Sequence, residues 1–288
     1  MAETKKYYAT FFISTGRCAT QWFADKLASN YQDFAEVVHE PFNEEYTPKK
    51  CFESFNRGVP MAVLPQIKKH FKRIERTLKS KHYIEVGWPV YGVLPYIISE
   101  LNISIKIIHL YRHPIRVAAS LMTHNVYNRG QWSELVAISP SDYGVVQSDL
   151  AGDLWKGMSD FEKCLFWWFE INHWALFLQK TFNSTQWLSL KYEDVFGENR
   201  QYILGNVLEF LELPEREGFF LSQKDKVDRF QLKVDDNFEI GSINKYPKVL
   251  GLMSSLGYDL GDVSAKEINK RFKNSLLKRV AHKIKIFS

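Results

Sequence analysis

The sequence lacks the features that would assign it to a membrane or a secretory class. No apolar run among its 288 residues approaches the roughly 18 that a membrane-spanning helix needs. The first ten residues, MAETKKYYAT, carry charge and contain no apolar signal region. We therefore expect a protein that is made and kept in the cytoplasm, unless a partner carries it elsewhere.

Cysteine is also scarce. The three cysteines, Cys18, Cys51 and Cys164, lie far apart in the sequence. They form neither a disulfide framework nor a zinc-binding pattern. The eight histidines also lack the spacing of metal ligands, so we expect no metal site.

The composition that remains is that of a globular protein, with 45% hydrophobic and 25% charged residues. The net charge of +5 is concentrated in residues 266–288, which contain eight Lys or Arg and one acid. The rest of the chain is close to neutral, and we expect no nucleic-acid partner. Apolar residues recur every three or four positions in 266–288, which predicts a basic amphipathic helix. This helix either packs on the domain with a solvated basic face or lies on an anionic membrane surface.

Short apolar runs alternate with helical patterns along most of the chain. The predicted strands are 7–13, 34–38, 83–86, 105–111 and 187–192, and the main predicted helices are 20–27, 66–79, 115–122, 160–180 and 200–211. This alternation predicts an α/β fold with three layers, in which helices cover both faces of a mostly parallel sheet. We expect residues 1–265 to form one domain. The irregular segment 125–159 is predicted to be a lid or a binding loop.

The first candidate site follows the first predicted strand. It consists of Gly16, Arg17, Cys18, Ala19, Thr20, Gln21 and Trp22. Free backbone N–H groups at the start of a helix, together with the helix dipole, favour an anion there. The nucleotide-binding pattern G-x-x-x-x-G-K-[ST] is absent, and with it the residues that hold Mg²⁺. The segment therefore predicts a phosphate-like ligand bound without that metal chemistry, and the alternative is an ordinary turn with an exposed arginine.

The second candidate site follows the strongest predicted strand, in the sequence LYRHPIRVAASL. Arg112 ends the strand, and Ser120 lies eight residues later within the next helix. A guanidinium group can bind a phosphate through two hydrogen bonds, and the serine hydroxyl can donate another. The alternative is an arginine that pairs with a nearby acid.

These two segments resemble the two nucleotide-binding motifs of sulfotransferases that use 3′-phosphoadenosine-5′-phosphosulfate (PAPS). STGRCATQW resembles the 5′-phosphosulfate loop, and YRHPIRVAASL resembles the 3′-phosphate motif Arg-x-Pro-x-x-x-x-x-Ser. LSLKYEDV, at 188–195, is similar to a third landmark, a strand that ends in Tyr-Glu-Asp. The resemblance covers residues 8–212 and implies the sulfotransferase version of the P-loop fold. One departure is Cys18-Ala19-Thr20, which stands where the family usually has Ser-Gly-Thr, so that either this loop uses ordinary helical angles or its phosphate contact is altered.

The resemblance also implies roles for individual residues. Arg17 would neutralise the leaving phosphate, and Thr20 and Gln21 would hold the 5′-phosphate. Arg112 and Ser120 would hold the 3′-phosphate. Tyr192 would lie near the adenine. PAPS would be the cosubstrate and adenosine 3′,5′-bisphosphate the product, with no metal required.

The acceptor must lose a proton as it attacks, so a general base is expected. Glu40 is the first candidate, because HEPF resembles the Glu-bearing segment of carbohydrate and tyrosyl-protein sulfotransferases. His39 is the competing candidate, and a structural role for Glu40, as a helix cap or a partner of Arg17, is the plainer alternative. Glu85 and Trp88, near the end of another predicted strand, are candidate acceptor contacts.

Two other functions remain open at this point. A nucleotide or small-molecule kinase on a related P-loop fold is one, although the missing G-K-[ST] argues against it. The other is a catalytically degenerate nucleotide-binding module, which the Cys18-Ala19 pair suggests.

Overall fold

The computed structural model describes residues 7–41, 48–60, 64–220, 233–235 and 237–274. Its centre is a sheet of five strands in the order β2-β3-β1-β4-β5, with every neighbouring pair parallel. The strands are β1 (Ala9–Ile13), β2 (Ala35–His39), β3 (His82–Val86), β4 (Ile105–Tyr111) and β5 (Trp187–Lys191). The predicted α/β class with a parallel sheet is confirmed.

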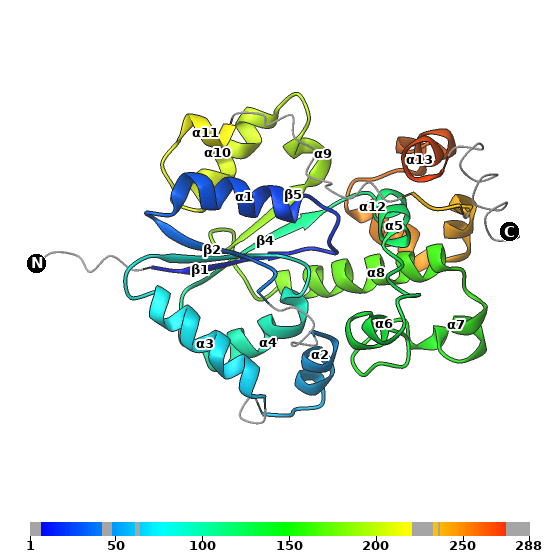
Figure 1. Ribbon diagram of the computed structural model, residues 1–288, viewed down its shortest axis with the longest axis horizontal. Coiled ribbons are helices and arrows are strands. Elements are labelled where there is room, and N and C mark those ends of the chain that lie inside the picture. The colour runs from blue at the N-terminus through cyan, green and yellow to red at the C-terminus, as the bar shows by residue number, and fades with distance from the viewer. Residues whose placement is uncertain (1–6, 42–47, 61–63, 221–232, 236, 275–288) are drawn as a thin grey trace, which may run out of the picture.

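Helices cover both faces of the sheet (Figure 1). Helices α1 and α10 lie above it in this view, and α3 and α4 lie below it. The α-helices are α1 (Thr20–Tyr31), α2 (Pro48–Asn56), α3 (Pro65–Thr77), α4 (Val90–Glu100), α5 (Pro114–Thr123), α6 (Gln131–Val136), α7 (Asp153–Gly157), α8 (Asp160–Gln179), α9 (Tyr192–Val195), α10 (Arg200–Phe210), α11 (Glu217–Phe220), α12 (Pro247–Ser255) and α13 (Ala265–Phe272). Within these described ranges, no helix is both long and apolar enough to cross a bilayer.

Local sequence explains where the longest helix begins. Ser159 caps α8 by accepting a hydrogen bond from the Glu162 N–H, and the Glu162 carboxylate accepts one from the Ser159 N–H. This reciprocal pair satisfies two N–H groups that would otherwise lack partners at the helix start. The strands β1 and β3 are buried at every position, as expected for parallel strands covered by helices on both faces.

The C-terminal segment differs from the prediction of one helix over 266–288. Helix α13 ends at Phe272, because Lys273 is extended and pairs with Val234 in an isolated parallel bridge. Its apolar side chains Ile268 and Phe272 are buried in the domain core rather than free to meet a membrane. Residues 275–288 of the predicted helix lie outside the described residues, and membrane contact by that part stays a prediction.

Candidate active site at the carboxyl ends of the strands

The two sequence motifs meet at one edge of the sheet. Strands β1 and β4 are parallel neighbours, so the segments that follow them leave the sheet side by side. The loop of residues 14–19 connects β1 to α1, and Arg112-His113 connects β4 to α5. In open parallel sheets, the crevice outside the carboxyl ends of the strands is the usual place for a ligand.

The loop before α1 has an unusual backbone. Gly16, Arg17 and Ala19 have φ angles of 75°, 59° and 66°. Ala19 is the N-cap residue of α1, and the start of the helix has no side-chain cap. N–H groups that no side chain caps, at the positive end of a helix dipole, suit an anionic ligand. Ordinary helical angles, one of the two alternatives for this loop, are therefore wrong at Ala19.

Replacing Ala19 by glycine should stabilise the protein. A left-handed residue with a side chain is strained by about 1–2 kcal/mol, part of which the greater freedom of unfolded glycine offsets. The expected gain is about 0.5–1 kcal/mol, or roughly 2 °C in the melting temperature of a chain this long. Scanning calorimetry would measure it.

Ala151→Gly is the control for this prediction. Ala151 is exposed and has a φ of −66°, so the same change there relieves no strain. It should lower the melting temperature by a similar amount. A loss of stability in both variants would show that Ala19 is unstrained.

Two direct contacts join the motifs. The Arg17 Nε donates to Ser120 Oγ at 2.9 Å, and the Arg112 Nη1 donates to the Arg17 carbonyl oxygen at 2.9 Å. The two candidate anion sites are therefore neighbours, and one ligand can contact both.

Arg112 is held in place but not fully satisfied. It is buried, and burial lowers the pKa of its guanidinium group. Its guanidinium carbon lies 4.0 Å from the centre of the Tyr192 ring. Its Nε is buried and has no hydrogen-bond partner within the part of the chain that the structure describes. A buried cation with an unpaired donor, placed by a ring and a carbonyl, is suited to an anion.

Two tryptophans of α8 hold the backbone of both motifs, and the sequence did not single them out for this role. The Trp167 indole N–H donates to the Thr15 carbonyl at 3.0 Å, and the Trp168 indole N–H donates to the Arg112 carbonyl at 2.8 Å. Both residues are buried in the core. Nothing in the local sequence shows which distant carbonyls they contact.

The remaining residues of the first motif make contacts within the protein. Cys18 is fully buried, and its thiol donates to the Gly16 carbonyl. Trp22 packs between the rings of Phe196 and Phe219. Thr20 is buried at the first turn of α1. The Gln21 side chain is partly exposed and donates to Asp25 at 2.7 Å.

Glu40 lies beside this loop, directly after β2. Its backbone is left-handed, with a φ of 44°, and its N–H donates to the Val86 carbonyl. Burial raises the pKa of its carboxyl group to about 7, although the backbone and indole N–H groups of Trp88 donate to it and Arg17 lies close enough to lower it. A carboxyl group with a pKa near neutrality can exchange a proton with a substrate.

Glycine at position 87 is required for this placement of Glu40. A side-chain carbon on Gly87 would lie 2.4 Å from the Glu40 Cγ, which is far inside van der Waals contact. Trp88, the next residue, is partly buried and packs against Gly16 on its other side. Glu40, Trp88 and the loop of residues 14–19 are thus in continuous contact.

His39 is the last residue of β2. Its Nε2 lies 3.5 Å from the Glu40 carboxylate. Burial lowers the pKa of the His39 imidazole. The two candidate bases therefore lie side by side. Burial raises the pKa of Glu40 towards neutrality, whereas it lowers the pKa of His39.

Glu85 does not reach this site. Its side chain is 0% exposed, and its carboxylate accepts a hydrogen bond from the Tyr83 hydroxyl and contacts the His70 ring, each at 2.9 Å. The expectation that Glu85 contacts the acceptor is therefore corrected: β3 points this side chain into the core beside α3. Trp88, predicted with it, does lie at the site.

No group of three or more His, Cys, Asp or Glu side chains that could hold a metal ion occurs among the described residues. The three cysteines are free and buried. The catalytic candidates at this edge of the sheet are the carboxyl group of Glu40, the imidazole of His39 and the guanidinium groups of Arg17 and Arg112.

Comparisons with known proteins agree with this geometry. The family model described as "Sulfotransferase domain" matches residues 10–235. The sulfotransferase domain of the Synechococcus PCC 7002 olefin synthase is similar in fold, with a TM-score of 0.52 and 16% identity over 89% of this chain and 97% of that one. The sulfotransferase domain from the curacin biosynthetic pathway has a TM-score of 0.53 and 12% identity, over 89% of this chain and 99% of that one. No curated protein sequence matches significantly.

Proposed function

Because the chain belongs to the sulfotransferase domain family, we propose that it transfers the sulfuryl group of PAPS to a hydroxyl or amine of an acceptor. The observation that carries this proposal is the junction of the two motifs. Arg17 donates to Ser120, Arg112 donates to the Arg17 carbonyl, and the Arg112 Nε has no hydrogen-bond partner among the described residues. A nucleotide with phosphates at both its 3′ and 5′ positions matches two adjacent anion sites.

In this reaction the acceptor oxygen or nitrogen attacks sulfur while the bond from sulfur to the 5′-phosphate oxygen breaks. Glu40 takes the acceptor proton, and Arg17 stabilises the negative charge that develops on the leaving phosphate. Arginine stays charged at neutral pH, so it acts here by electrostatics rather than by donating a proton. The Tyr192 ring, held against Arg112, supports a place for the adenine beside it.

We favour a carbohydrate or a lipid-linked glycan as the acceptor. The reason is the resemblance of HEPF, which contains Glu40, to the corresponding segment of carbohydrate sulfotransferases. We also infer that the protein works in the cytoplasm. Neither inference is needed for the choice of cosubstrate.

Thermal stability measurements test the cosubstrate. Adenosine 3′,5′-bisphosphate without metal should raise the melting temperature by several degrees, since a ligand at a hundred times its Kd adds about 2.7 kcal/mol to stability. Adenosine 5′-monophosphate, which lacks the 3′-phosphate, is the control and should give a smaller shift. Stronger stabilisation by ATP with Mg²⁺ would instead indicate a kinase.

A turnover assay completes this test. Incubation with labelled PAPS and a panel of glycans and alcohols should give a labelled product. Binding of the bisphosphate with no product from any acceptor would favour a degenerate nucleotide-binding module.

A further inference from the structure

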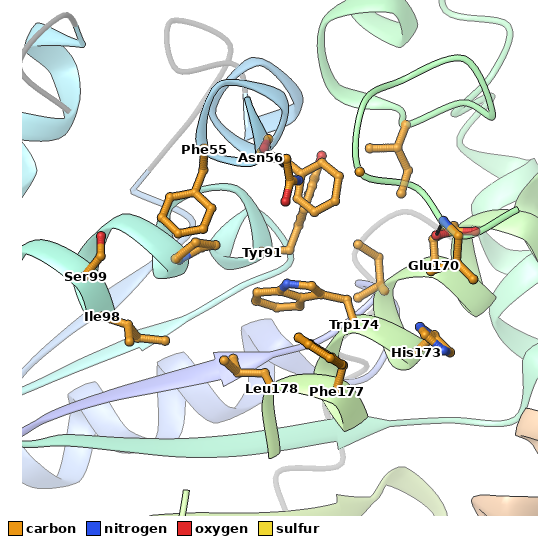
Figure 2. A pocket seen from close by; sticks show the side chains of 16 residues that line it. Phe55, Asn56, Tyr91, Ile98, Ser99, Glu170, His173, Trp174, Phe177 and Leu178 are labelled. Carbon is orange, nitrogen blue, oxygen red and sulfur yellow. Dashed lines mark hydrogen bonds between the residues drawn. The ribbon is translucent and has the colours of Figure 1, made fainter. Parts of the chain in front are cut away.

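A cavity of about 490 Å³ lies away from the two arginines, between α2, α4, α8 and residues 138–146 (Figure 2). Apolar side chains form most of its wall. Tyr91 and Ile98 come from α4, and Trp174 and Phe177 come from α8. Its volume is within the range of ordinary ligand sites, roughly 300–1,000 Å³.

The few polar groups of the cavity carry no positive charge. Neither Lys nor Arg is among its described lining residues. His173 lines it, and burial lowers the pKa of that imidazole, which favours the neutral form. Glu170 also lines it, but both of its carboxylate oxygens accept backbone hydrogen bonds, from Val146 at 2.9 Å and from Gln147 at 2.8 Å. An anionic headgroup would find no cation in this lining to offset its desolvation, and the nearby Lys180 and Lys248, which also lower the pKa of His173, are not among the lining residues.

The loop that lines one side of the cavity is held in place by contacts with α8 and α2. Glu170 holds residues 146 and 147 through the two bonds above. Farther along the loop, Gly144 lies so close to α2 that a side-chain carbon would meet the Asn56 amide nitrogen at 2.3 Å. These contacts hold the loop against both α8 and α2, and Gly144 and Val146 of this loop line the cavity.

One aromatic layer separates the cavity from the transfer site. The Tyr91 ring, which lines the cavity, lies 6.4 Å from the Trp88 ring and 5.5 Å from the Trp167 ring. Trp88 contacts Glu40 and Trp167 holds the phosphate-binding loop. A ligand in the cavity would thus contact Tyr91, whose ring packs against both Trp88 and Trp167.

We propose that this cavity binds an uncharged aliphatic chain. A methylene group is similar in size to a water molecule, which occupies about 30 Å³ in the liquid, so a cavity of about 490 Å³ has room for roughly 16 carbon atoms, enough for a dodecyl chain. The apolar lining provides the driving force, and the lack of a cation excludes a carboxylate or a phosphate end group. The chain belongs either to the acceptor or to a separate lipid.

A fluorescence titration tests this proposal without PAPS. The uncharged probe N-phenyl-1-naphthylamine should bind to the whole protein with increased emission, and 1-dodecanol should displace it. Dodecanoate, which differs by its charge, should displace it at least about tenfold more weakly. Equal displacement by the alcohol and the carboxylate would overturn the proposal, as would an absence of probe binding.

Paired variants locate the binding. Ile98→Trp fills the cavity and should weaken probe binding at least about tenfold, whereas Ile103→Trp, at a partly buried residue outside the lining, should leave it unchanged. Phe177→Asp is a second test and should also weaken probe binding. It does not depend on repacking the interior, because Phe177 is 63% exposed. Its control is Tyr202→Asp, at a residue outside the cavity lining that is 70% exposed. Equal binding by Phe177→Asp and Tyr202→Asp would place the probe outside the cavity.

A turnover experiment shows whether the aliphatic chain belongs to the acceptor or to a separate lipid. This experiment is the only part of the test that rests on the proposed function. If the chain is part of the acceptor, the KM of primary alcohols should fall from butanol to dodecanol in the parent but not in Ile98→Trp. If it belongs to a separate lipid, dodecanol should bind while the KM of acceptors is independent of chain length. Probe binding can be measured even where no sulfuryl transfer is detected. The proposal of a chain-binding cavity and the proposed sulfotransferase activity can therefore be disproved independently.

Discussion

Replacing Arg112 by methionine should weaken the binding of adenosine 3′,5′-bisphosphate by at least roughly 30-fold, measured by calorimetric titration. Losing one partner of a buried charged contact costs about 2–5 kcal/mol, and about 1.4 kcal/mol corresponds to each factor of ten in affinity. Methionine keeps much of the packing against the Tyr192 ring while removing the charge and the donors. The substitution therefore tests the anion site itself.

The unliganded protein should tolerate this change. Burial lowers the pKa of Arg112, which means that the fold disfavours its charged form when no anion is present. The free energy of unfolding should therefore change by no more than about 1 kcal/mol, close to the value of the single hydrogen bond to Arg17. A site that lowers stability until its ligand arrives is common in proteins that bind charged groups.

Arg116→Met is the matched control for Arg112→Met. Arg116 lies one helical turn later, and its guanidinium group pairs with Glu267 and the Asp262 carbonyl rather than with the nucleotide-binding segments. It should change nucleotide affinity less than about twofold, because a surface ion pair contributes little. Equal affinities for the parent and Arg112→Met would mean that the 3′-phosphate binds elsewhere.

The sequence predicted the general architecture because parallel sheets leave a strong local signal. Strands buried on both faces must be apolar almost throughout, as β1 and β4 are, so their positions can be read directly. Because each motif directly follows a strand, the rule for carboxyl ends also placed Arg17 and Arg112 at one edge. That β1 and β4 are neighbours is a property of the whole sheet, and it is this pairing that brings the motifs into contact.

Other parts of the site could not be read because they depend on distant contacts or on backbone strain. The sequence around Glu85 predicts a strand whether the Glu85 carboxylate faces the acceptor or the core. The contact with His70 of α3, which holds the carboxylate in the core, cannot be read from that local sequence. The left-handed backbone of Ala19 contradicts the ordinary preference of alanine. Strain of this kind persists where surrounding structure enforces it, which is frequent at functional sites.

Replacing Glu40 by glutamine should reduce turnover at least about tenfold while leaving the affinity for adenosine 3′,5′-bisphosphate unchanged. A general base typically contributes ~10²–10⁴-fold to rate, and glutamine preserves shape and polarity but cannot accept the proton. Glu40 lies on the Trp88 side of the loop of residues 14–19, whereas Arg112 and Ser120 contact Arg17 of that loop. Steady-state kinetics with PAPS and calorimetric titration of the product would measure the two effects separately.

The pH dependence gives a second, independent readout. A base must be ionised to act, so kcat/KM should rise with pH and level off above the pKa of Glu40, which burial raises to about 7. Folding favours the protonated carboxyl group, so the contribution of Glu40 to stability is lost as pH rises from its unfolded pKa towards about 7. In Glu40→Gln this dependence of stability should disappear together with the rise in kcat/KM.

Two further variants separate Glu40 from its neighbours. Glu36→Gln makes the same change on the same strand. The Glu36 carboxylate accepts hydrogen bonds from Arg73 and Thr77 rather than facing the loop, so this variant should leave turnover within about twofold of the parent.

His39→Asn distinguishes the competing base. Burial lowers the pKa of His39 below its usual value, so if His39 were the base, kcat/KM would level off at a lower pH and Glu40→Gln would keep full turnover. Because the two side chains are 3.5 Å apart, the pH at which the rate levels off, rather than the position of either residue, identifies which of them takes the proton.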